Sequence, residues 1–377
     1  MSNTIKLGNF ISEYSVRNRA GDDIPVYSVT NKEGFCRDYF SKDVASQDRS
    51  TYKIVPRGCF AYNPSRINVG SVDWQRKEDR VIVSPLYVIF SVSKGLDQQY
   101  LYYYLKSEKC LYYIKELASG SVRDNLKLSM LKEFTIPNIT LEEQRKAVMV
   151  LEQTDRLIAL KERQMTVLDE LVKSRFVEMF GAYQATIKIG KVSEIVGGIT
   201  KNGKRNSMPI KKPYLRVANV FFNKIDTTEM LEIGLSEDEY RKTRLIQGDL
   251  LFVEGNGSPD QIGRVSVWND ELEDCVHQNH LIRVRLDSKR VLPTFAMYYF
   301  MTQEGRKQIQ VKAVSTSGLY TLSVSKIADF QIPLPGIDEQ VAFNDLVQQI
   351  DKSKLAVQQS LEKLETLKKS LMQRYFG

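Results

Sequence analysis

Three residues near position 280 carry side chains that bind transition metals: Cys275, His277 and His280. Zinc centres take three or four such ligands at short spacings, and no fourth ligand follows here at a usable distance. Side chains that alternate along a β-strand explain this grouping more simply. We therefore expect no metal centre.

A second pattern resembles the signature of metal-dependent nucleases. Pro259 and Asp260, followed by Asp287 and Lys289, satisfy the loose arrangement P-D…D-x-K. Because 27% of the residues are charged, so loose a pattern arises easily by chance. It does not by itself predict nuclease activity.

Signatures of cofactor binding and catalysis are weak. The stretch FVEGNG at 252–257 resembles a glycine loop for S-adenosylmethionine, but Pro259 and an alternating apolar run follow it, where a helix is required. A hairpin turn fits better. NPSR at 63–66 and SPLY at 84–87 lack the second proline of an adenine-methylation motif, no ATP-binding G-x-x-x-x-G-K-[ST] loop occurs, and only two histidines are present for acid–base chemistry. These missing motifs disfavour a self-contained methyltransferase or restriction enzyme, which stays open as an alternative.

Basic and amide side chains offer a different chemistry, the binding of nucleic acid. Basic loops suit phosphate contacts, whereas arginine, asparagine and glutamine read base edges. The predicted phosphate contacts in KNGKRNSMPIKK are Lys201, Lys204, Arg205, Lys211 and Lys212, and the predicted base-reading residues are Asn256, Gln261, Arg264, Gln278 and Asn279. The candidates in the first half of the chain are Arg17, Arg19, Arg49, Lys53, Arg57, Arg66, Arg76, Lys77 and Arg80. For each of them, an ordinary solvated surface position is the alternative.

Five tyrosines form an aromatic-rich segment beside these candidates. They are Tyr102, Tyr103, Tyr104, Tyr112 and Tyr113. Their spacing suits a helix packed on its own sheet, so we predict core positions for them and no role in stacking on bases.

Length and composition limit the architecture. A chain of 377 residues is too long for one ordinary core and predicts two or three domains. The most apolar window, 81–92, is too short to cross a bilayer, and four widely spaced cysteines fit reduced thiols. We expect a cytoplasmic protein without a membrane partner.

Positive charge is concentrated in two segments. Lys+Arg minus Asp+Glu is 20 − 15 = +5 for residues 1–140 and 21 − 17 = +4 for 182–336, against 7 − 8 = −1 for 141–181 and 6 − 6 = 0 for 337–377. Two basic bodies of similar size suggest that both meet a polyanion. Ordinary surface variation explains the same values equally well.

An internal repeat joins these segments into two copies of one unit. FTIPNITLEEQ at 134–144 recurs as FQIPLPGIDEQ at 330–340. The offset of 196 residues continues without a gap to FG at 180–181 and 376–377. This period is half the chain, far longer than a solenoid repeat. We therefore predict a duplicated domain-plus-helix unit, with domains at 1–140 and 182–336 and helices at 141–181 and 337–377.

Both tails of the repeat predict long helices that pair as an antiparallel coiled coil. Thr140 and Glu143 form a capping box, and Gly336 and Glu339 occupy the matching positions. Apolar residues then recur at alternating spacings of four and three, which is typical of a heptad seam. The predicted seam comprises Leu151, Ile158, Met165, Leu168, Val172 and Met179, with Val347, Ile350, Val357, Leu361, Leu364 and Leu371. The alternative is that each helix packs only on its own domain.

These repeated segments resemble the conserved regions of type I restriction-modification specificity subunits. The resemblance rests on I-P, then E-E-Q or D-E-Q, then a long helix that ends in F-G, twice in that order. It implies two target recognition domains that read the halves of a bipartite, asymmetric DNA sequence, in a subunit that itself carries no catalysis. We expect each of the two mixed α/β domains to contain mainly non-local strands and a helix or two. It also implies that two methyltransferase subunits and restriction subunits dock on the chain, and that S-adenosylmethionine, ATP and Mg belong to those partners.

The predicted helices suggest how two half-sites would be separated. A helix of about 40 residues spans roughly 60 Å, so a coiled coil of this length would act as a spacer between two DNA-reading domains. A structural coiled-coil protein without a DNA role is the remaining alternative.

Overall fold

The computed structural model describes residues 4–37, 49–118, 125–316 and 318–377. The chain divides into two compact units, Met1–Glu162 with Gln358–Gly377, and Arg163–Val357. Each unit contains a globular domain and one half of each long helix. The boundaries that we drew from the sequence follow the ends of the helices, whereas the compact units divide both helices.

Unit 1 has a mixed α/β domain built on an antiparallel sheet of order β2–β9–β6–β7. Smaller antiparallel pairs join β1 to β10, β3 to β4 and β5 to β8. The strands are β1 (Thr4–Lys6), β2 (Ile11–Glu13), β3 (Ser28–Thr30), β4 (Gly34–Cys36), β5 (Lys53–Pro56), β6 (Phe60–Tyr62), β7 (Val72–Trp74), β8 (Arg80–Val83), β9 (Val88–Val92) and β10 (Thr135–Pro137). The helices are α1 (Gln98–Leu105), α2 (Glu108–Ala118) and α3 (Leu128–Lys132).

Unit 2 repeats this plan with additions. Its main sheet has the order β12–β21–β17–β19, and β11 pairs with β24. The strands are β11 (Thr186–Lys188), β12 (Ser193–Gly197), β13 (Ile210–Leu215), β14 (Val220–Phe221), β15 (Lys224–Ile225), β16 (Leu231–Leu235), β17 (Leu250–Val253), β18 (Gly255–Asn256), β19 (Val265–Val267), β20 (Val276–His277), β21 (Leu281–Leu286), β22 (Val314–Thr316), β23 (Leu319–Thr321) and β24 (Gln331–Pro333). The helices are α5 (Glu237–Thr243), α6 (Pro293–Met301), α7 (Gln303–Lys312) and α8 (Val324–Ala328).

The two domains are copies of one fold. In chain order, β2, β6, β7 and β9 correspond to β12, β17, β19 and β21, and α1, α2 and α3 correspond to α6, α7 and α8. The mixed α/β class is confirmed. Our expectation of a helix or two per domain was wrong, because the described residues form three short helices in the first domain and four in the second.

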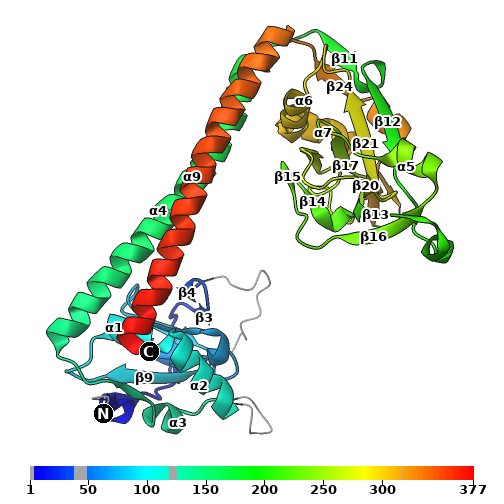
Figure 1. The fold of residues 1–377 in the computed structure, drawn as a ribbon. Helices are drawn as coiled ribbons and strands as arrows, with labels where there is room; N and C mark the ends of the chain where they lie inside the picture. Colours follow the sequence, from blue (N-terminus) through cyan, green and yellow to red (C-terminus); the bar gives the residue numbers. More distant parts are fainter. Residues whose placement is uncertain (1–3, 38–48, 119–124, 317) are drawn as a thin grey trace. The chain divides into compact units, whose positions relative to one another are not determined.

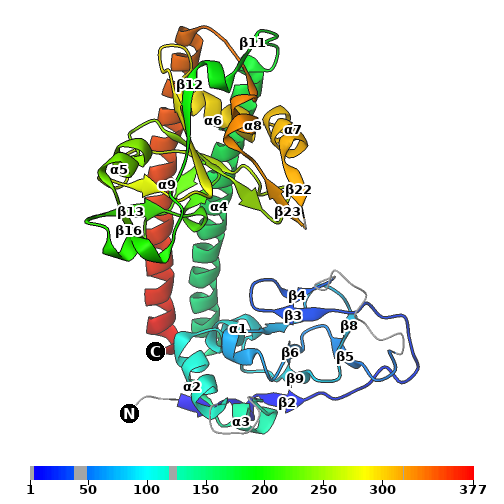
Figure 2. The same cartoon turned by 90° about the vertical axis from the view of Figure 1, so that its right-hand side faces the viewer.

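The two long helices are α4 (Leu141–Phe180) and α9 (Ile337–Phe376), and they run side by side (Figure 1, Figure 2). In unit 1, Lys368 Nζ lies 2.6 Å from Asp155 Oδ1. In unit 2, Lys354 Nζ lies 2.6 Å from Asp169 Oδ1. Fourteen residues forward along α4 therefore match fourteen residues backward along α9 (169 − 155 = 368 − 354). This register confirms the antiparallel pair.

The predicted seam faces inward along both helices. Each of its twelve residues is buried or half-buried, and Leu151 and Val172 are almost completely so. The helices also pack on the domains at their ends, because Phe180 and Phe376 are buried in the cores of unit 2 and unit 1 respectively. Each long helix thus packs on the other helix and on a domain core at its end, so the alternative, in which each helix packs only on its own domain, is wrong.

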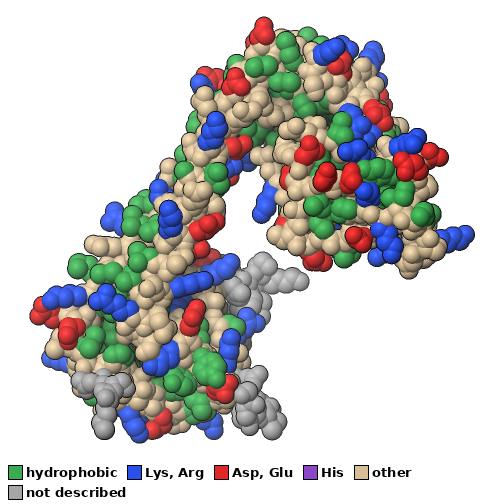
Figure 3. Space-filling model, viewed as in Figure 1, with side chains coloured by type: hydrophobic (Ala, Val, Ile, Leu, Met, Phe, Trp, Pro, Cys, Tyr) green, Lys and Arg blue, Asp and Glu red, His purple; other side chains and the backbone are tan. Residues whose placement is uncertain are grey.

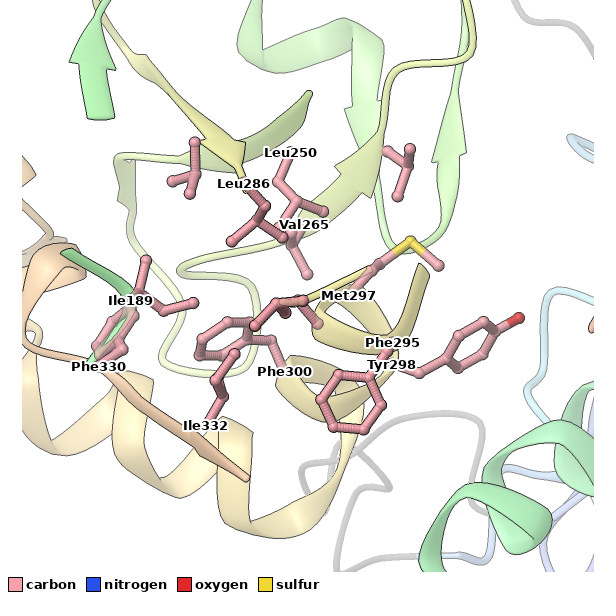
Figure 4. Packing of buried hydrophobic residues seen from close by; sticks show 14 of the residues in the cluster. Ile189, Leu250, Val265, Leu286, Phe295, Met297, Tyr298, Phe300, Phe330 and Ile332 are labelled. Atoms are coloured by element: carbon pink, nitrogen blue, oxygen red, sulfur yellow. The ribbon is translucent and has the colours of Figure 1, made fainter. Parts of the chain in front are cut away.

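The core of unit 2 lies between the main sheet and α6 (Figure 4). Leu250, Val265 and Leu286 point from the sheet toward α6, where Phe295 and Phe300 fill the space. All five side chains are at least nine-tenths buried. Burying an aromatic or leucine side chain stabilises a fold by about 1.5–3 kcal/mol, so this layer fixes how the helices sit on the sheet.

A buried glutamine at the start of each long helix ties that helix to its domain. Gln144 accepts a hydrogen bond from Asp97 N (2.8 Å) and donates to Gly95 O (3.1 Å) and Ile139 O (3.1 Å). Asp97 is the N-cap of α1. The glutamine of the E-E-Q motif therefore joins the beginning of α4 to the beginning of α1.

Gln340 makes the same contacts in unit 2. It accepts from Leu292 N (2.8 Å), the N-cap of α6, and donates to Arg290 O (3.0 Å) and Pro335 O (3.1 Å). Each amide thus makes hydrogen bonds to three backbone groups. The repeated motif is a repeated structural contact.

The first turns of the two long helices differ in their caps. Thr140 Oγ1 accepts from Glu143 N at 3.3 Å, and Thr140 N donates to Glu143 Oε2 at 2.8 Å, which completes the predicted capping box. In α9 only the second half forms, from Gly336 N to Glu339 Oε2 at 3.0 Å, because glycine has no side chain to accept the other bond.

The tyrosine-rich segment is only partly in the core. Tyr103 and Tyr104 are buried on α1, and Tyr102 is half-buried. The core prediction was wrong for Tyr112 and Tyr113, which lie on α2 and are 60% and 47% exposed. Here the sequence does not distinguish the buried face of one helix from the open face of the next.

Replacing Gln340 with methionine should destabilise unit 2. Methionine has a similar size but cannot replace the amide's bonds to Leu292, Arg290 and Pro335, so three buried or part-buried hydrogen bonds are lost. We expect the free energy of unfolding to fall by about 2 kcal/mol, measured as a lower urea midpoint. The control is Gln349→Met, at an exposed position on the same helix. Equal midpoints for the two variants would contradict the role of this glutamine.

Candidate nucleic-acid interface

Three of the five predicted phosphate contacts in unit 2 are open to solvent. Lys201, Lys204 and Lys211 are exposed in and beside the short 3-10 helix Gly203–Ser207 that precedes β13. Their side chains have no hydrogen bond or ion pair to another described residue. Lys211 lies on β13, whereas Lys201 and Lys204 lie in the segment before it. Free ammonium groups at such exposed positions suit contact with a phosphate backbone.

Arg205, from the same segment, requires a correction. Its guanidinium is buried and donates to both carboxylate oxygens of Glu239, at 3.1 and 2.9 Å, and to Gly234 O at 3.1 Å. A side chain at Gly234 would place its Cβ 1.9 Å from Arg205 O, so glycine is needed for this close approach. Arg205 holds its segment on β16 and α5, and we remove it from the set of phosphate contacts.

Lys212 is also engaged within the domain. Its Nζ lies 2.6 Å from Asp274 Oδ2 and 5.2 Å from the centre of the Tyr240 ring. The hydrogen bond to Asp274 raises the pKa of the lysine, which therefore stays charged but has a local counter-ion.

Two predicted base-reading residues lie at the end of β20. Gln278 and Asn279 are half-buried, and the backbone of both is tied to Ile199: Ile199 and Gln278 form an isolated bridge, and Asn279 N donates to Ile199 O at 3.0 Å. Gly198 makes this approach possible, because a Cβ there would meet Gln278 O at 2.3 Å. The structure thus brings these two residues beside the basic segment that begins at Lys201.

Asn256 and Arg264 lie in the segment between β17 and β19. The side chains of both already make contacts within the domain. Asn256 Oδ1 accepts from Ser258 N at 2.9 Å. The Arg264 guanidinium donates to Val217 O at 3.1 Å and lies 5.4 Å from the centre of the Phe221 ring. Burial lowers the pKa of Arg264. These contacts shape the loop, whose FVEGNG portion connects strands and not a strand to a helix, as expected.

Gln261 is exposed on that loop, and α7 holds the loop in place. Arg306 Nη2 donates to Asp260 O at 3.2 Å and to Ile262 O at 2.7 Å, and its Nη1 donates to Gly263 O at 3.3 Å. We did not single out Arg306 from the sequence. An arginine inside a helix gives no local signal that it braces a loop more than forty residues earlier.

The nine candidates of unit 1 divide into three groups. Three arginines make exposed ion pairs: Arg49 with Asp23, Arg57 with Asp79 and Arg80 with Asp22, at 3.4, 3.3 and 3.2 Å. Such surface pairs stabilise a fold by only about 0–1 kcal/mol, so their guanidinium groups can exchange a carboxylate for a phosphate at little cost.

A second group is engaged more firmly. Lys53 Nζ donates to Tyr87 O at 2.7 Å and Lys77 Nζ to Phe35 O at 2.8 Å. Arg76 lies 3.1 Å from Asp73, a buried carboxylate, and 5.0 Å from the Trp74 ring centre. The third group, Arg17, Arg19 and Arg66, is exposed, with no side-chain hydrogen bond or ion pair to another described residue.

The charges of both units are mixed on one face of the surface. On the face shown in Figure 3, Lys and Arg side chains lie among Asp and Glu side chains. Binding to DNA would then depend on individual contacts more than on one uniform positive field.

The histidines and cysteines do not form a metal site in the described part of the chain, where no group of three or more His, Cys, Asp or Glu residues is placed to hold an ion. His277 is buried on β20, with its ring nitrogens 3.1 Å from Thr243 O and 3.3 Å from Val196 O. Burial lowers its pKa to about 4. His280 is exposed and pairs with Glu254 at 3.3 Å.

Comparison with known protein families gives one match, and it covers most of the chain. The model of the type I restriction modification DNA specificity domain matches residues 7–170 and again residues 184–367. The chain belongs to this family. The two matches coincide with the two copies of the domain-plus-helix unit.

Curated relatives agree with this assignment. The chain is 25% identical over 290 residues to the type I restriction enzyme EcoKI specificity subunit of Escherichia coli and 24% identical over 310 residues to the StySPI specificity subunit of Salmonella potsdam. It is 26% identical over 185 residues to the putative MjaX specificity subunit of Methanocaldococcus jannaschii. The matches cover 70%, 75% and 47% of this chain, and 61%, 65% and 43% of those relatives, so the chain spans less than two thirds of each.

Solved structures share the fold over nearly the whole chain. A chain from a study of complex assembly and conformational transition in a type I restriction-modification system matches at a TM-score of 0.62 and 15% identity, over 99% of this chain and 97% of that one. The S subunit of a type I system from M. genitalium matches at 0.52 and 13%, over 99% and 96%. Within the described residues, no helix combines the length and apolarity that crossing a bilayer requires.

The Arg205–Glu239 pair predicts how acid affects unit 2. The hydrogen bond from Arg205 lowers the pKa of Glu239 from 4.5 to about 2 in the folded protein. A lowered folded-state pKa stabilises the fold above pH 4.5, and this contribution is lost as the pH falls from 4.5 toward 2. Glu239→Gln should therefore lower the thermal midpoint at pH 6 and have a smaller effect at pH 3.

The matched control is Glu237→Gln, at an exposed glutamate on the same helix. Its effect should be small at both pH values. A midpoint difference between wild type and Glu239→Gln that is equal at pH 6 and pH 3 would rule out this ion pair as the acid-sensitive contact.

Proposed function

We propose that this chain is the DNA-recognition subunit of a type I restriction-modification complex. Each domain reads one half of a bipartite, asymmetric DNA sequence, and the paired helices set the number of unread base pairs between the halves. The observation that carries this proposal is the duplication of one domain, with the same strand order, on two antiparallel helices. A duplicated reader suits a target in two parts.

The residues available for DNA contact support direct readout with help from phosphate contacts. Free lysines in unit 2 and, in unit 1, Arg17, Arg19 and the weakly paired arginines suit the DNA backbone. The amide side chains of Gln261, Gln278 and Asn279 suit base edges. The subunit acts on double-stranded DNA in the cytoplasm and carries out no chemistry itself.

Catalysis is assigned to partner subunits. Two methyltransferase subunits dock on the chain and bring S-adenosylmethionine, and restriction subunits bring the ATP- and Mg-dependent activity. This division is consistent with the scarcity of catalytic motifs in the sequence and with the family to which the chain belongs.

Reconstitution tests the proposal directly. The purified chain alone should bind DNA weakly, and adding the methyltransferase from the same gene set should give sequence-specific binding and adenine methylation. Affinity should fall steeply as salt rises, because phosphate contacts release counterions. A lone chain that methylates or cuts DNA would show a self-contained enzyme, and a complex with no DNA affinity at any salt concentration would show a structural protein.

Exchange of one domain tests the independence of the two readers. Replacing residues 1–140 with the matching segment of a relative should change one half of the methylated sequence and leave the other half unchanged. Mapping of modified adenines by single-molecule sequencing of host DNA measures both halves at once. A change in both halves would mean that the domains do not read separately.

A further inference from the structure

One turn recurs in the two domains at the tip of equivalent strand connections. It joins β6 to β7 as Asn63-Pro64-Ser65-Arg66 and precedes β19 as Ser258-Pro259-Asp260-Gln261. The offset between these segments is 195 residues, one less than in the helices (261 − 66 = 195). Because strands β6 and β7 correspond to β17 and β19, the two turns occupy the same place in the fold.

The two turns share the backbone hydrogen bond between their fourth and first residues. Arg66 N donates to Asn63 O at 2.9 Å, and Gln261 N donates to Ser258 O at 3.1 Å. Proline in the second position favours such a turn because its φ is already fixed near the required value.

The first side chain of each turn also has the same role. Asn63 Oδ1 accepts from Ser65 N at 3.0 Å, and Ser258 Oγ accepts from Asp260 N at 3.3 Å. Asparagine and serine side chains stabilise turns in this way. The turn is therefore the same local structure, built twice from different residues.

An isoleucine anchors each turn to its domain core. Ile67 and Ile262 directly follow the fourth turn residue and are 1% and 0% exposed. Ile67 belongs to the core that contains α1, and Ile262 to the core that contains α6. The backbone of the fourth residue is thus fixed at the surface beside a packed core.

That fourth residue is exposed to solvent in both domains. Arg66 and Gln261 are exposed, and neither side chain makes a hydrogen bond or ion pair to another described residue. The two positions have the same kind of backbone turn, are each followed by a buried isoleucine and are both exposed. Their side chains differ in chemistry. Arginine pairs with the O6 and N7 of guanine, and glutamine with the N6 and N7 of adenine.

We propose that Arg66 and Gln261 are equivalent specificity-determining residues, one for each half-site. Arg66 reads a guanine and Gln261 reads an adenine in the major groove. This inference rests on the proposed function and adds which residues read and which bases they select. It explains how one duplicated frame recognises two different half-sites.

Each turn is held in place by hydrogen bonds from another segment of its domain, as suits a loop that contacts bases. Arg306 and Gln310 of α7 both approach Pro259 O, at 3.4 and 3.2 Å. In unit 1, Leu126 N approaches Pro64 O at 3.4 Å. Bracing of an exposed loop preorganises it, which lowers the entropy lost when a side chain docks on a base.

The test uses the complete complex in its host, with modified adenines mapped across the genome. Gln261→Ala should relax one base position in one half-site, with a loss of discrimination of roughly 10- to 100-fold. Arg66→Ala should do the same at one position of the other half-site. Gln261→Arg should change the preferred base at its position from adenine to guanine, a gain that misfolding cannot produce.

Two exposed turn residues serve as controls. Gln247→Ala removes a glutamine from a turn in unit 2, and Lys32→Ala removes a basic side chain from a turn in unit 1. Both should leave the methylated sequence unchanged. A phosphate contact at either control position would alter overall methylation but not base preference.

The outcomes separate the two proposals. If the wild-type complex methylates no two-part sequence, the proposed function fails and this inference fails with it. If wild type does so and Gln261→Arg and Arg66→Ala keep the wild-type base preferences in both half-sites, the inference alone is overturned. A change in the same half-site from both variants would also overturn it, because each residue is assigned to its own domain.

Discussion

The hydrophobic core of each domain is completed by residues from the beginning of one long helix and the end of the other. In unit 2, Phe176 of α4 packs on Phe343 of α9 with ring centres 5.2 Å apart, inside the core that contains the main sheet. In unit 1, Phe376 of α9 packs on Tyr100 of α1 at 4.9 Å, in the core that also contains Leu151 of α4. An antiparallel helix pair is therefore a condition for completing either core. The coiled coil is part of both domains as well as the link between them.

The sequence predicted the long helices and their pairing well because heptad spacing and caps are local signals. It missed the front of the repeat, where TIK at 4–6 and 186–188 forms β1 and β11, because the offset there is 182 residues and loops of unequal length change it to 196. The order of the strands in the sheets could not be predicted from the sequence, because it depends on pairing between strands that are far apart in the chain. Arg205 shows the same limit at a single residue, because a basic, glycine-containing segment suggests an exposed side chain. Only the fold shows that the Arg205 guanidinium donates hydrogen bonds to Gly234 O and Glu239.

Two arginines on the main sheet of unit 2 form ion pairs within the domain and are not free to contact DNA. Arg283 is 1% exposed and lies 2.8 Å from Glu194, while Arg285 forms two bonds of 2.8 Å to the fully buried Asp249. Removing Glu194 or Arg285 would leave the buried Arg283 or the buried Asp249 without its counter-ion, which is destabilising. Because both pairs are neutral, the basic excess of this domain comes from its other charged residues. Its exposed lysines and amides matter more than its net charge.

Duplication sets a requirement that the structure meets in a specific way. Two copies of one fold bind different sequences only if the residues that differ can change without disturbing the shared core. The matched turns satisfy this, because Ile67 and Ile262 supply the buried contact while the neighbouring exposed residue contributes nothing to the interior. Surface substitutions of that kind usually change stability by less than about 0.5 kcal/mol. Recognition can thus diverge between the copies while the sheet, the turn and the helix pair stay the same.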